Sequence, residues 1–526
     1  MTSQHLSVHT RAAELRAAVD TEFDVLVIGM GAGGAAIALD AASRGLTVCV
    51  VDRGDLASGT SGTLVHGGLR SYGTSSFGAA RAEAAERALL QRLAPHLVHP
   101  LNVLAPVWPS SPRAVVRPAD VLSLAAPGTR RRRLSAQQAG ALAPALAGSG
   151  LTGADRYGDC TTDDARLVLA MVQAARAFGA LAVTYADVSD VRRDDAGRVD
   201  GALLVDRLHG DELLLRARHV VQAIGSIQPE RAVQLVLPKQ RLPLDVTGVV
   251  LPGSPSLFAL PWGGQTILGG RTTDAPPGTV GPTSDELAQV LAEANTALHP
   301  DGGALQLTDV LATWVDTQPR GAAADHGITE GSDALLSIAD GSLTTYRRTA
   351  AEVVDRIVAR DGRRAPSRTD RISLGGTRPA ERLQAEITSA AAALGLDADT
   401  AVALVRQSGE QAADVLSIVA VDPTLGRQLS PDAPHIAAEV VYAARAEGAV
   451  TLDDVFRRRM RLSLRSRDAS LPAARFAADL LAAETGRDAA WAHAQVLAYA
   501  EAVRRERGAL GVELVLPSGA ALAPAR

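Results

Sequence analysis

The first residues that could do chemistry are the glycines of a G-x-G-x-x-G pattern, Gly29, Gly31 and Gly34. They follow the apolar run FDVLVI, whose length and β-branched residues are typical of a buried strand. A helical pattern, AAIALDAASRG, comes next, and a second apolar run, LTVCVV, ends at Asp52. This acid stands 18 residues after Gly34 (52 − 34), near the spacing of about 20 at which such an acid binds a ribose.

The order of strand, glycine turn, helix, strand and acid predicts a dinucleotide-binding unit. Gly29 would permit the tight turn, Gly31 would let backbone approach a diphosphate, and Gly34 would let the helix pack close to the strand. Gly33 lies in the same turn, where free N–H groups at the start of a helix attract phosphate. Asp52 is expected to accept hydrogen bonds from the adenosine ribose. The position of this unit near the start of a long mixed chain favours FAD over NAD.

Eight further segments resemble the FAD-dependent glycerol-3-phosphate dehydrogenase family. They are ASGTS (57–61), LVHGGLR (64–70), APHL (94–97), YGDCTTDDARLVLA (157–170), ARHVVQAIG (217–225), PWGGQTILGGRTTD (261–274), DGSLTTYRRTAAEVVD (340–355) and HIAAEVVYAARAEGAVTLDDVFRRRMRL (435–462). The resemblance implies oxidation of sn-glycerol 3-phosphate to dihydroxyacetone phosphate, with a hydride passing to flavin N5. It also implies an electron acceptor such as a quinone.

The same resemblance assigns site residues. The cofactor contacts that it adds are Thr60, Ser61, Gly67, Gly68, Gly225, Gly341, Leu343 and Thr344. It leaves His66, Arg70 and Arg347 as the catalytic candidates. For His66 and Arg70 the alternative is structural support of the HGG turn. No metal site is predicted.

The substrate side departs from the family pattern at its charged positions. Gln318 stands where arginine is usual, Ser342 where lysine is usual, and 245–248 (DVTG) where lysine-glycine-x-histidine is usual. The stretch before HGGLR is shorter than in the family and lacks its lysine. A phosphate dianion is held by cationic groups, and each buried cation that is lost costs about 2–5 kcal/mol. Turnover of glycerol 3-phosphate is therefore predicted to be weak or absent.

Three functions follow from these observations. The preferred one is the family's own oxidation, because the resemblance spans nearly the whole chain. It would need compensating cations, for which Arg320, Lys239 and Arg241 are the candidates. The second is an FAD enzyme acting on a less anionic substrate, such as another hydroxy acid or an amine. The third is a degenerate paralogue that binds FAD weakly or not at all and acts through protein contacts.

These motifs need an α/β fold: a Rossmann-like FAD-binding domain, an antiparallel-sheet substrate domain and an all-helical C-terminal domain. Short β-like runs fill 182–275, and helical periodicity dominates from about residue 378. The expected division is a flexible N-terminus at 1–19, an FAD-binding domain at 20–105, 150–235 and 330–375, a substrate domain at 106–149 and 236–329, and a helical domain at 376–515.

Composition excludes several classes. Hydrophobic residues make up 47% of the 526 residues, which is ample for a core. Lys+Arg is 53 and Asp+Glu is 58, so the net charge of −5 gives no field that would draw nucleic acid to the whole surface. Two cysteines, Cys49 and Cys160, cannot build a disulfide framework, and both are predicted to be buried.

Localisation follows from what the sequence lacks. The first twenty residues contain no apolar signal region, and no stretch of about 18 uncharged apolar residues occurs. A cytoplasmic protein is expected. The basic run 457–467 (RRRMRLSLRSR) could give peripheral contact with anionic lipid at the inner face of the membrane, but a structural role is favoured. The oligomeric state is open, with a homo-oligomer among the options.

Overall fold

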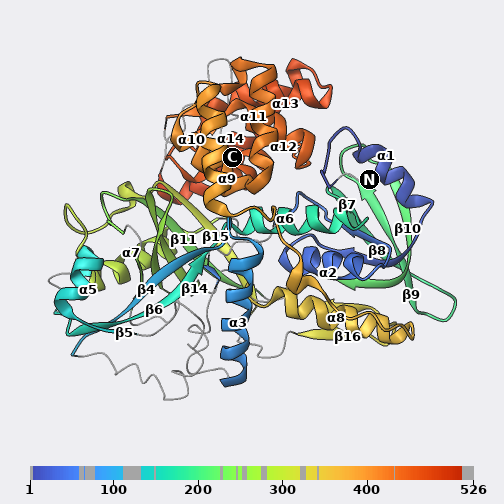
Figure 1. The fold of residues 1–526 in the computed structure, drawn as a ribbon, viewed down its shortest axis with the longest axis horizontal. Coiled ribbons are helices and arrows are strands. Elements are labelled where there is room, and N and C mark those ends of the chain that lie inside the picture. The colour runs from blue at the N-terminus through green and yellow to red at the C-terminus, as the bar shows by residue number, and fades with distance from the viewer. Residues whose placement is uncertain are drawn as a thin grey trace.

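The computed structural model describes residues 4–58, 64–65, 77–109, 132–146, 150–224, 229–244, 247–251, 257–273, 281–319, 327–339, 343–431 and 433–511. Figure 1 shows a helical part, in orange and red, above two parts that each contain a sheet. The predicted α/β fold class, with a mixed nucleotide-binding sheet, a largely antiparallel second sheet and a helical C-terminal region, is confirmed.

The first sheet carries the nucleotide-binding motif. Its central order is β16-β17-β10-β1-β2-β7, with β9 and then β8 continuing from β10. The strands are β1 (Glu22–Ile28), β2 (Val48–Val51), β7 (Leu181–Val183), β8 (Ala186–Arg193), β9 (Val199–Asp206), β10 (Glu212–Gln222), β16 (Ile328–Glu330) and β17 (Leu336–Ile338). Strand β1 pairs in parallel with both β2 and β10, and Ile28 stands opposite Val51 and Gln222. The carboxyl ends of these three strands therefore lie at one edge.

Helices cover both faces of this sheet. On one face, α2 (Ala32–Ser43) lies between α6 (Asp164–Ala177) and α8 (Tyr346–Arg360). Helix α1 (Arg11–Val19) lies against β7 and β10 (Figure 1). Apolar side chains of the strands and of α2, α6 and α8 form one core. Cys49 is completely buried in β2, and burial raises the pKa of its thiol. Cys160 is also buried, with the pKa of its thiol raised to about 12, so the prediction for both cysteines is confirmed.

The second sheet has the order β15-β11-β14-β13-β12-β4-β6-β3, and β5 pairs with β6. Its strands are β3 (Leu64–Val65), β4 (His99–Val107), β5 (Arg132–Ser135), β6 (Gly153–Thr161), β11 (Pro229–Pro238), β12 (Thr247–Val250), β13 (Phe258–Trp262), β14 (Gln265–Thr273) and β15 (Ala312–Pro319). The associated helices are α3 (Phe77–Leu93), α5 (Ala136–Leu142), α7 (Ser284–Ala297) and the short 3-10 turns Pro144–Leu146 and Leu307–Asp309. Only β4 and β12 pair in parallel among these described strands.

This sheet moves three predicted domain boundaries, those near residues 105, 150 and 235. Strands β4 and β6 fall in ranges expected for the FAD-binding domain, 20–105 and 150–235, as do most residues of β11. All three strands belong to the second sheet, and β4 pairs with β6 along nine residues. The sequence shows that a segment is strand-like, but the partner of a strand depends on contacts distant in the chain.

The C-terminal region is mainly helical in the described residues up to 511, which confirms the predicted fold class of this region. Its elements are α9 (Ala380–Ala393), α10 (Ala398–Ser408), α11 (Ala412–Val421), α12 (Ala437–Ala446), α13 (Leu471–Thr485) and α14 (Ala489–Arg507), with β18 (Gln428–Ser430), β19 (Ala433–Ile436) and a π-helical turn, Asp454–Arg459. Short 3-10 turns occupy Thr369–Arg371, Gly409–Gln411, Pro423–Gly426, Leu462–Leu464 and Gly508–Leu510. Strands β18 and β19 form a hairpin and are only three and four residues long. No long strand therefore interrupts the helices in the part that the structure describes.

The predicted flexible N-terminus, 1–19, is wrong from the first described residues onward. The backbone N–H groups of Leu6 and Val8 donate to Ala446 and Ala444 of α12, each at 3.1 Å. Leu6 is 4% exposed. Arg11 then binds both carboxylate oxygens of Asp206 at the first sheet. Scattered anchors of this kind give no periodic signal in a sequence, which is why the segment looks unstructured there.

Candidate functional site

The turn after β1 needs its glycines for steric reasons. Gly29 has φ +104°, and a Cβ there would lie 2.4 Å from the carbonyl oxygen of Ala223. A Cβ on Gly34 would lie 1.9 Å from the carbonyl oxygen of Gly29. The first glycine thus permits the turn and the last one brings α2 against the strand, which is the geometry that the sequence predicts.

The start of α2 fits an anionic group. Its N-cap, Gly31, is extended and has no side-chain cap, and no acidic residue stands in the first turn. The first-turn N–H groups of a helix lack acceptors within the helix and carry the positive end of its dipole. Gly33 belongs to this turn and faces the end of β17, where its Cβ would meet Ile338 Cδ1 at 2.7 Å. A diphosphate fits the donors exposed here.

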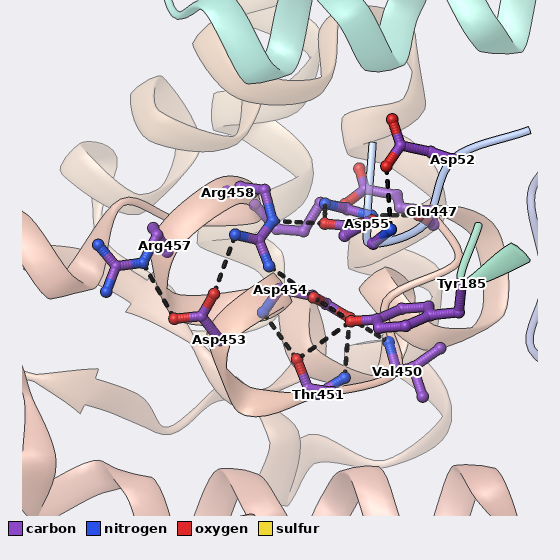
Figure 2. A network of polar contacts seen from close by, with 12 residues as sticks. Asp52, Asp55, Tyr185, Glu447, Val450, Thr451, Asp453, Asp454, Arg457 and Arg458 are labelled. Atoms are coloured by element: carbon purple, nitrogen blue, oxygen red, sulfur yellow. Dashed lines mark hydrogen bonds and ion pairs between the residues drawn. The ribbon is translucent and has the colours of Figure 1, made fainter. Parts of the chain in front are cut away.

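Asp52 lies beside this turn, directly after β2. Its Oδ2 accepts from Met30 N at 2.7 Å and its Oδ1 from Gly54 N at 2.9 Å. Each oxygen has a second acceptor position, so the carboxylate can still receive hydroxyl donors. Burial raises the pKa of Asp52, against the opposing effect of the two backbone donors. Figure 2 shows Asp52 beside a network of ion pairs.

That network begins three residues further along the loop, at Asp55. Asp55 is 2% exposed and accepts from Arg458 Nε at 2.6 Å and from both terminal nitrogens of Arg459, at 2.7 and 2.9 Å. Burial alone would raise the pKa of Asp55, but Arg459 and Arg458 outweigh it and hold the pKa below its usual value. The C-terminal helical part therefore contacts the nucleotide-binding loop directly.

The rest of the basic run also points inward. Arg457 pairs with Asp453 at 3.0 Å, and Arg461 pairs with Asp163 at 2.8 Å and with Asp164. These two guanidinium groups are half-buried and paired with carboxylates, so they do not form an open basic patch. The structural role that the sequence favours for the run is therefore confirmed for these residues.

A cavity of about 150 Å³ lies where three parts of the chain meet. Its walls come from the loop after β2, from the second sheet and from the arginine segment, and they include Ser58, Asp164, Trp262, Trp314, Arg458 and Arg461. The cavity is small and mixed in polarity. Carboxylates already balance all three arginines of its wall, Arg457, Arg458 and Arg461, so it is not an open site for a phosphate dianion.

Half of the residues predicted to contact the flavin or to act in catalysis lie outside the described residues. They are Thr60, Ser61, His66, Gly67, Gly68, Arg70, Gly225 and Gly341, together with Asp245, Arg320 and Ser342 on the substrate side. Gln318 is in β15 opposite Glu230 of β11, and Gly248 is in β12 opposite Val103 of β4. The second sheet thus carries both positions.

Three predicted residues sit at the start of α8. Leu343 packs on the core of the first sheet, and Thr344 is completely buried. Arg347 donates from Nε to Glu86 Oε2 at 2.8 Å and from a terminal nitrogen to the other oxygen of that carboxylate. This bidentate pair ties α8 to α3, so the geometry gives Arg347 a structural contact and no support for the predicted catalytic role. Of the candidate compensating cations, Arg241 is held by Asp309 at 2.7 Å.

Sequence reasoning missed the residues that join the parts. Asp55 and Tyr185 are not part of any recognised motif. The sequence contains one hint of such contacts, because a run of arginines inside an apolar helical region needs acidic partners. Arg465 likewise stacks over the Trp262 ring at 4.1 Å and donates to Gly263 O, which attaches the second sheet to the helical part.

The described residues contain neither a membrane-spanning helix nor a cluster of metal ligands. No helix there has both the length and the apolar character needed to cross a membrane. No group of three or more His, Cys, Asp or Glu side chains there is arranged to hold a metal ion.

Comparison with known proteins agrees with this geometry. The family model "FAD dependent oxidoreductase" matches residues 24–338, and "C-terminal domain of alpha-glycerophosphate oxidase" matches residues 367–492. The chain is 35% identical to glycerol-3-phosphate dehydrogenase 1 of Mycobacterium tuberculosis, covering 89% of this chain and 96% of that protein. It is 33% identical to the glycerol-3-phosphate dehydrogenase of Mycobacterium leprae, covering 95% and 91%.

A solved structure extends the similarity to three dimensions. Glycerol-3-phosphate dehydrogenase from Bacillus halodurans, complexed with FAD, superposes with a TM-score of 0.79 at 26% identity, covering 95% of this chain and 98% of that one. This protein belongs to the FAD-dependent glycerol-3-phosphate dehydrogenase family and is an FAD-dependent oxidoreductase.

Proposed function

We propose that this protein oxidises the C2 hydroxyl of sn-glycerol 3-phosphate to the carbonyl of dihydroxyacetone phosphate. The observation that carries the proposal is the nucleotide turn: Gly29 and Gly34 bring an uncapped helix start beside Asp52. It occurs in a chain that matches named glycerol-3-phosphate dehydrogenases along about nine-tenths of its length.

The cofactor would be held at two places in the described residues. The N–H groups of Gly31–Gly34 would bind its diphosphate, and the carboxylate of Asp52 would accept the ribose hydroxyls. When bound, FAD supplies a hydride acceptor at N5. The surrounding backbone is fixed before binding by Met30, whose N–H reaches Asp52 and whose carbonyl accepts from Ala57 N at 3.0 Å. A preformed site of this kind reduces the ordering cost of binding.

We assign the proton chemistry to His66. A general base must take the C2 hydroxyl proton as the hydride leaves, and neutral imidazole does this near pH 7. Arg70 would then hold the substrate phosphate as a guanidinium fork. Both residues lie in the family motif LVHGGLR (64–70). Electrons would leave to a quinone-type acceptor, which is a proposal based on the family alone.

Weak turnover is part of the proposal. Gln318 and Ser342 stand where the family pattern has cations. The loss of such cations lowers the affinity for a phosphate dianion by orders of magnitude. The same substitutions favour a second candidate function, the oxidation of a less anionic hydroxy substrate in the same pocket.

The test is a steady-state assay of FAD-loaded protein with an artificial electron acceptor. Glycerol 3-phosphate, glycerol, lactate and glycine would be compared at equal concentration, and dihydroxyacetone phosphate would be assayed as product. The expected result is slow formation of dihydroxyacetone phosphate. Faster oxidation of a substrate without phosphate would replace the first function by the second, and a protein that cannot be loaded with FAD would contradict both.

A further inference from the structure

The buried carboxylate of Asp55 is gripped from two directions by neighbouring arginines. Arg459 binds both carboxylate oxygens with two terminal nitrogens, at 2.7 and 2.9 Å, and Arg458 adds its Nε at 2.6 Å. Arg459 is 1% exposed and also donates to the carbonyl of Glu447 at 2.7 Å. Figure 2 shows Asp55 and its contact with Arg458 close to Asp52. A two-point grip of this kind fixes the orientation of a carboxylate as well as its position.

The gripped residue belongs to the short loop that carries Asp52. Within this loop Gly54 N donates to Asp52 Oδ1 at 2.9 Å, so the backbone just before Asp55 is in contact with the Asp52 carboxylate. The corner between β7 and β8 binds the backbone of the same loop. Tyr185 N donates to Gly54 O at 2.8 Å, and Ala186 N donates to Asp52 O at 2.7 Å. Asp55 and Asp52 are therefore connected through the backbone of Gly54.

The same corner is itself tied to the arginine segment. Tyr185, in the left-handed region at φ +58°, donates its hydroxyl to Asp454, whose two oxygens lie 2.7 and 2.8 Å away. Asp454 in turn accepts from Arg458 at 2.6 Å. The loop, the corner and the π-helical turn thus form a closed set of buried contacts (Figure 2). A backbone held in a sparsely populated region marks a place where the surroundings impose the geometry.

We propose that Arg458 and Arg459 are positioning residues for the cofactor. They hold Asp55 so that the 52–57 loop presents the Asp52 carboxylate to the adenosine ribose. FAD affinity is therefore set in part by the C-terminal helical part, which acts on the cofactor site through Asp55. This inference rests on the ribose contact assigned to Asp52 under the proposed function.

Lysine is the informative replacement for Arg459. It keeps the positive charge but offers a single ammonium in place of a planar fork, so Asp55 stays neutralised while its orientation is released. Arg445→Lys is a control for the substitution, at an arginine whose side chain is half exposed. Arg445 lies in the same helical part and makes a bidentate pair with Glu484 at 2.7 Å, with no contact to the loop.

The experiment measures dissociation constants of the apoprotein for FAD, by quenching of flavin fluorescence, and for ADP, by calorimetry. Arg459→Lys should weaken both by the same factor, about 10- to 100-fold, because ADP contains the ribose that Asp52 contacts. Arg445→Lys should leave both unchanged. Arg458→Lys serves if Arg459→Lys does not fold, as judged by the melting temperature of the apoprotein.

A double-mutant cycle separates positioning from a general loss of structure. In an Asp52→Ala background, Arg459→Lys should change FAD affinity by less than about threefold, since the group it positions is gone. An equal effect in both backgrounds would overturn the inference. The inference would also be overturned if Asp52→Ala lowered the affinity for FAD while Arg459→Lys left it unchanged. If Asp52→Ala itself binds FAD normally, the ribose contact is wrong, and the inference built on it falls as well.

Discussion

Gly34 packs directly against the carbonyl oxygen of Gly29, so close that a Cβ on Gly34 would lie 1.9 Å from it. The obstacle is backbone, which cannot rotate away as a side chain can. Gly34→Ala is therefore expected to destabilise the apoprotein by about 3 kcal/mol or more and to abolish flavin retention.

The neighbouring glycine provides a control. At Gly33 the new methyl would meet only Ile338 Cδ1, the end of a flexible side chain, at 2.7 Å. The gain in helix propensity, about 1 kcal/mol, should offset that adjustment. Urea unfolding of the two apoproteins decides the matter. Equal loss of stability in both variants would contradict the packing argument.

The strand, glycine turn, helix and acid could be predicted from the sequence because each is encoded within a few residues. Gly29, Gly34 and Asp52 are local signals, and the structure places all three together. The pairing of Asp55 with Arg459 could not be predicted in this way, because it joins residues 404 positions apart. The same limit explains the errors over Leu6 and over the sheet to which β4 belongs.

Arg11 offers a test of the N-terminal correction. It is 8% exposed and donates to both oxygens of Asp206 and to the carbonyl of Thr184. Arg11→Met should lower the free energy of unfolding by about 3 kcal/mol, because a buried carboxylate loses its arginine partner and keeps the weaker contacts with His209 and the N–H of Leu208. Arg16→Met, on the exposed side of the same helix, should change it by less than about 0.5 kcal/mol. A flexible segment would give two equally small changes.

His96 makes stability depend on pH. Burial, with Arg166 nearby, lowers the pKa of its imidazole to about 4 from an ordinary 6.5. Between about pH 6.5 and pH 4, His96 is protonated in the unfolded chain but neutral in the folded chain. The free energy of unfolding is therefore highest above about pH 6.5 and falls as the pH drops toward 4. The difference amounts to about 3 kcal/mol.

His96→Gln should remove that part of the pH dependence. Urea unfolding at pH 7 and pH 4.5 would show a smaller difference in the variant than in the unmodified protein. The exposed His299→Gln is the control and should keep the full difference. If His96→Gln shows the same pH dependence as the unmodified protein, this imidazole is not the group responsible.

Activity toward glycerol 3-phosphate should be restored by replacing the missing cations at positions 318 and 342. Gln318→Arg and Ser342→Lys would each supply a cation for the substrate phosphate, and each should raise kcat/KM for glycerol 3-phosphate at least about 10-fold. Neither change should improve oxidation of a substrate without phosphate. Gln318→Leu is the matched control and should give no gain. If these cations leave kcat/KM unchanged, the assignment of these positions to the phosphate pocket is wrong.

The most direct test of the central claim is anaerobic reduction of the bound flavin by glycerol 3-phosphate in a stopped-flow spectrometer. Hydride transfer to FAD bleaches its visible absorbance without any external acceptor, so neither the quinone nor turnover enters the measurement. The account predicts complete but slow bleaching that saturates with glycerol 3-phosphate, with one dihydroxyacetone phosphate formed per flavin. A flavin that dithionite reduces and that glycerol 3-phosphate leaves fully oxidised would contradict it.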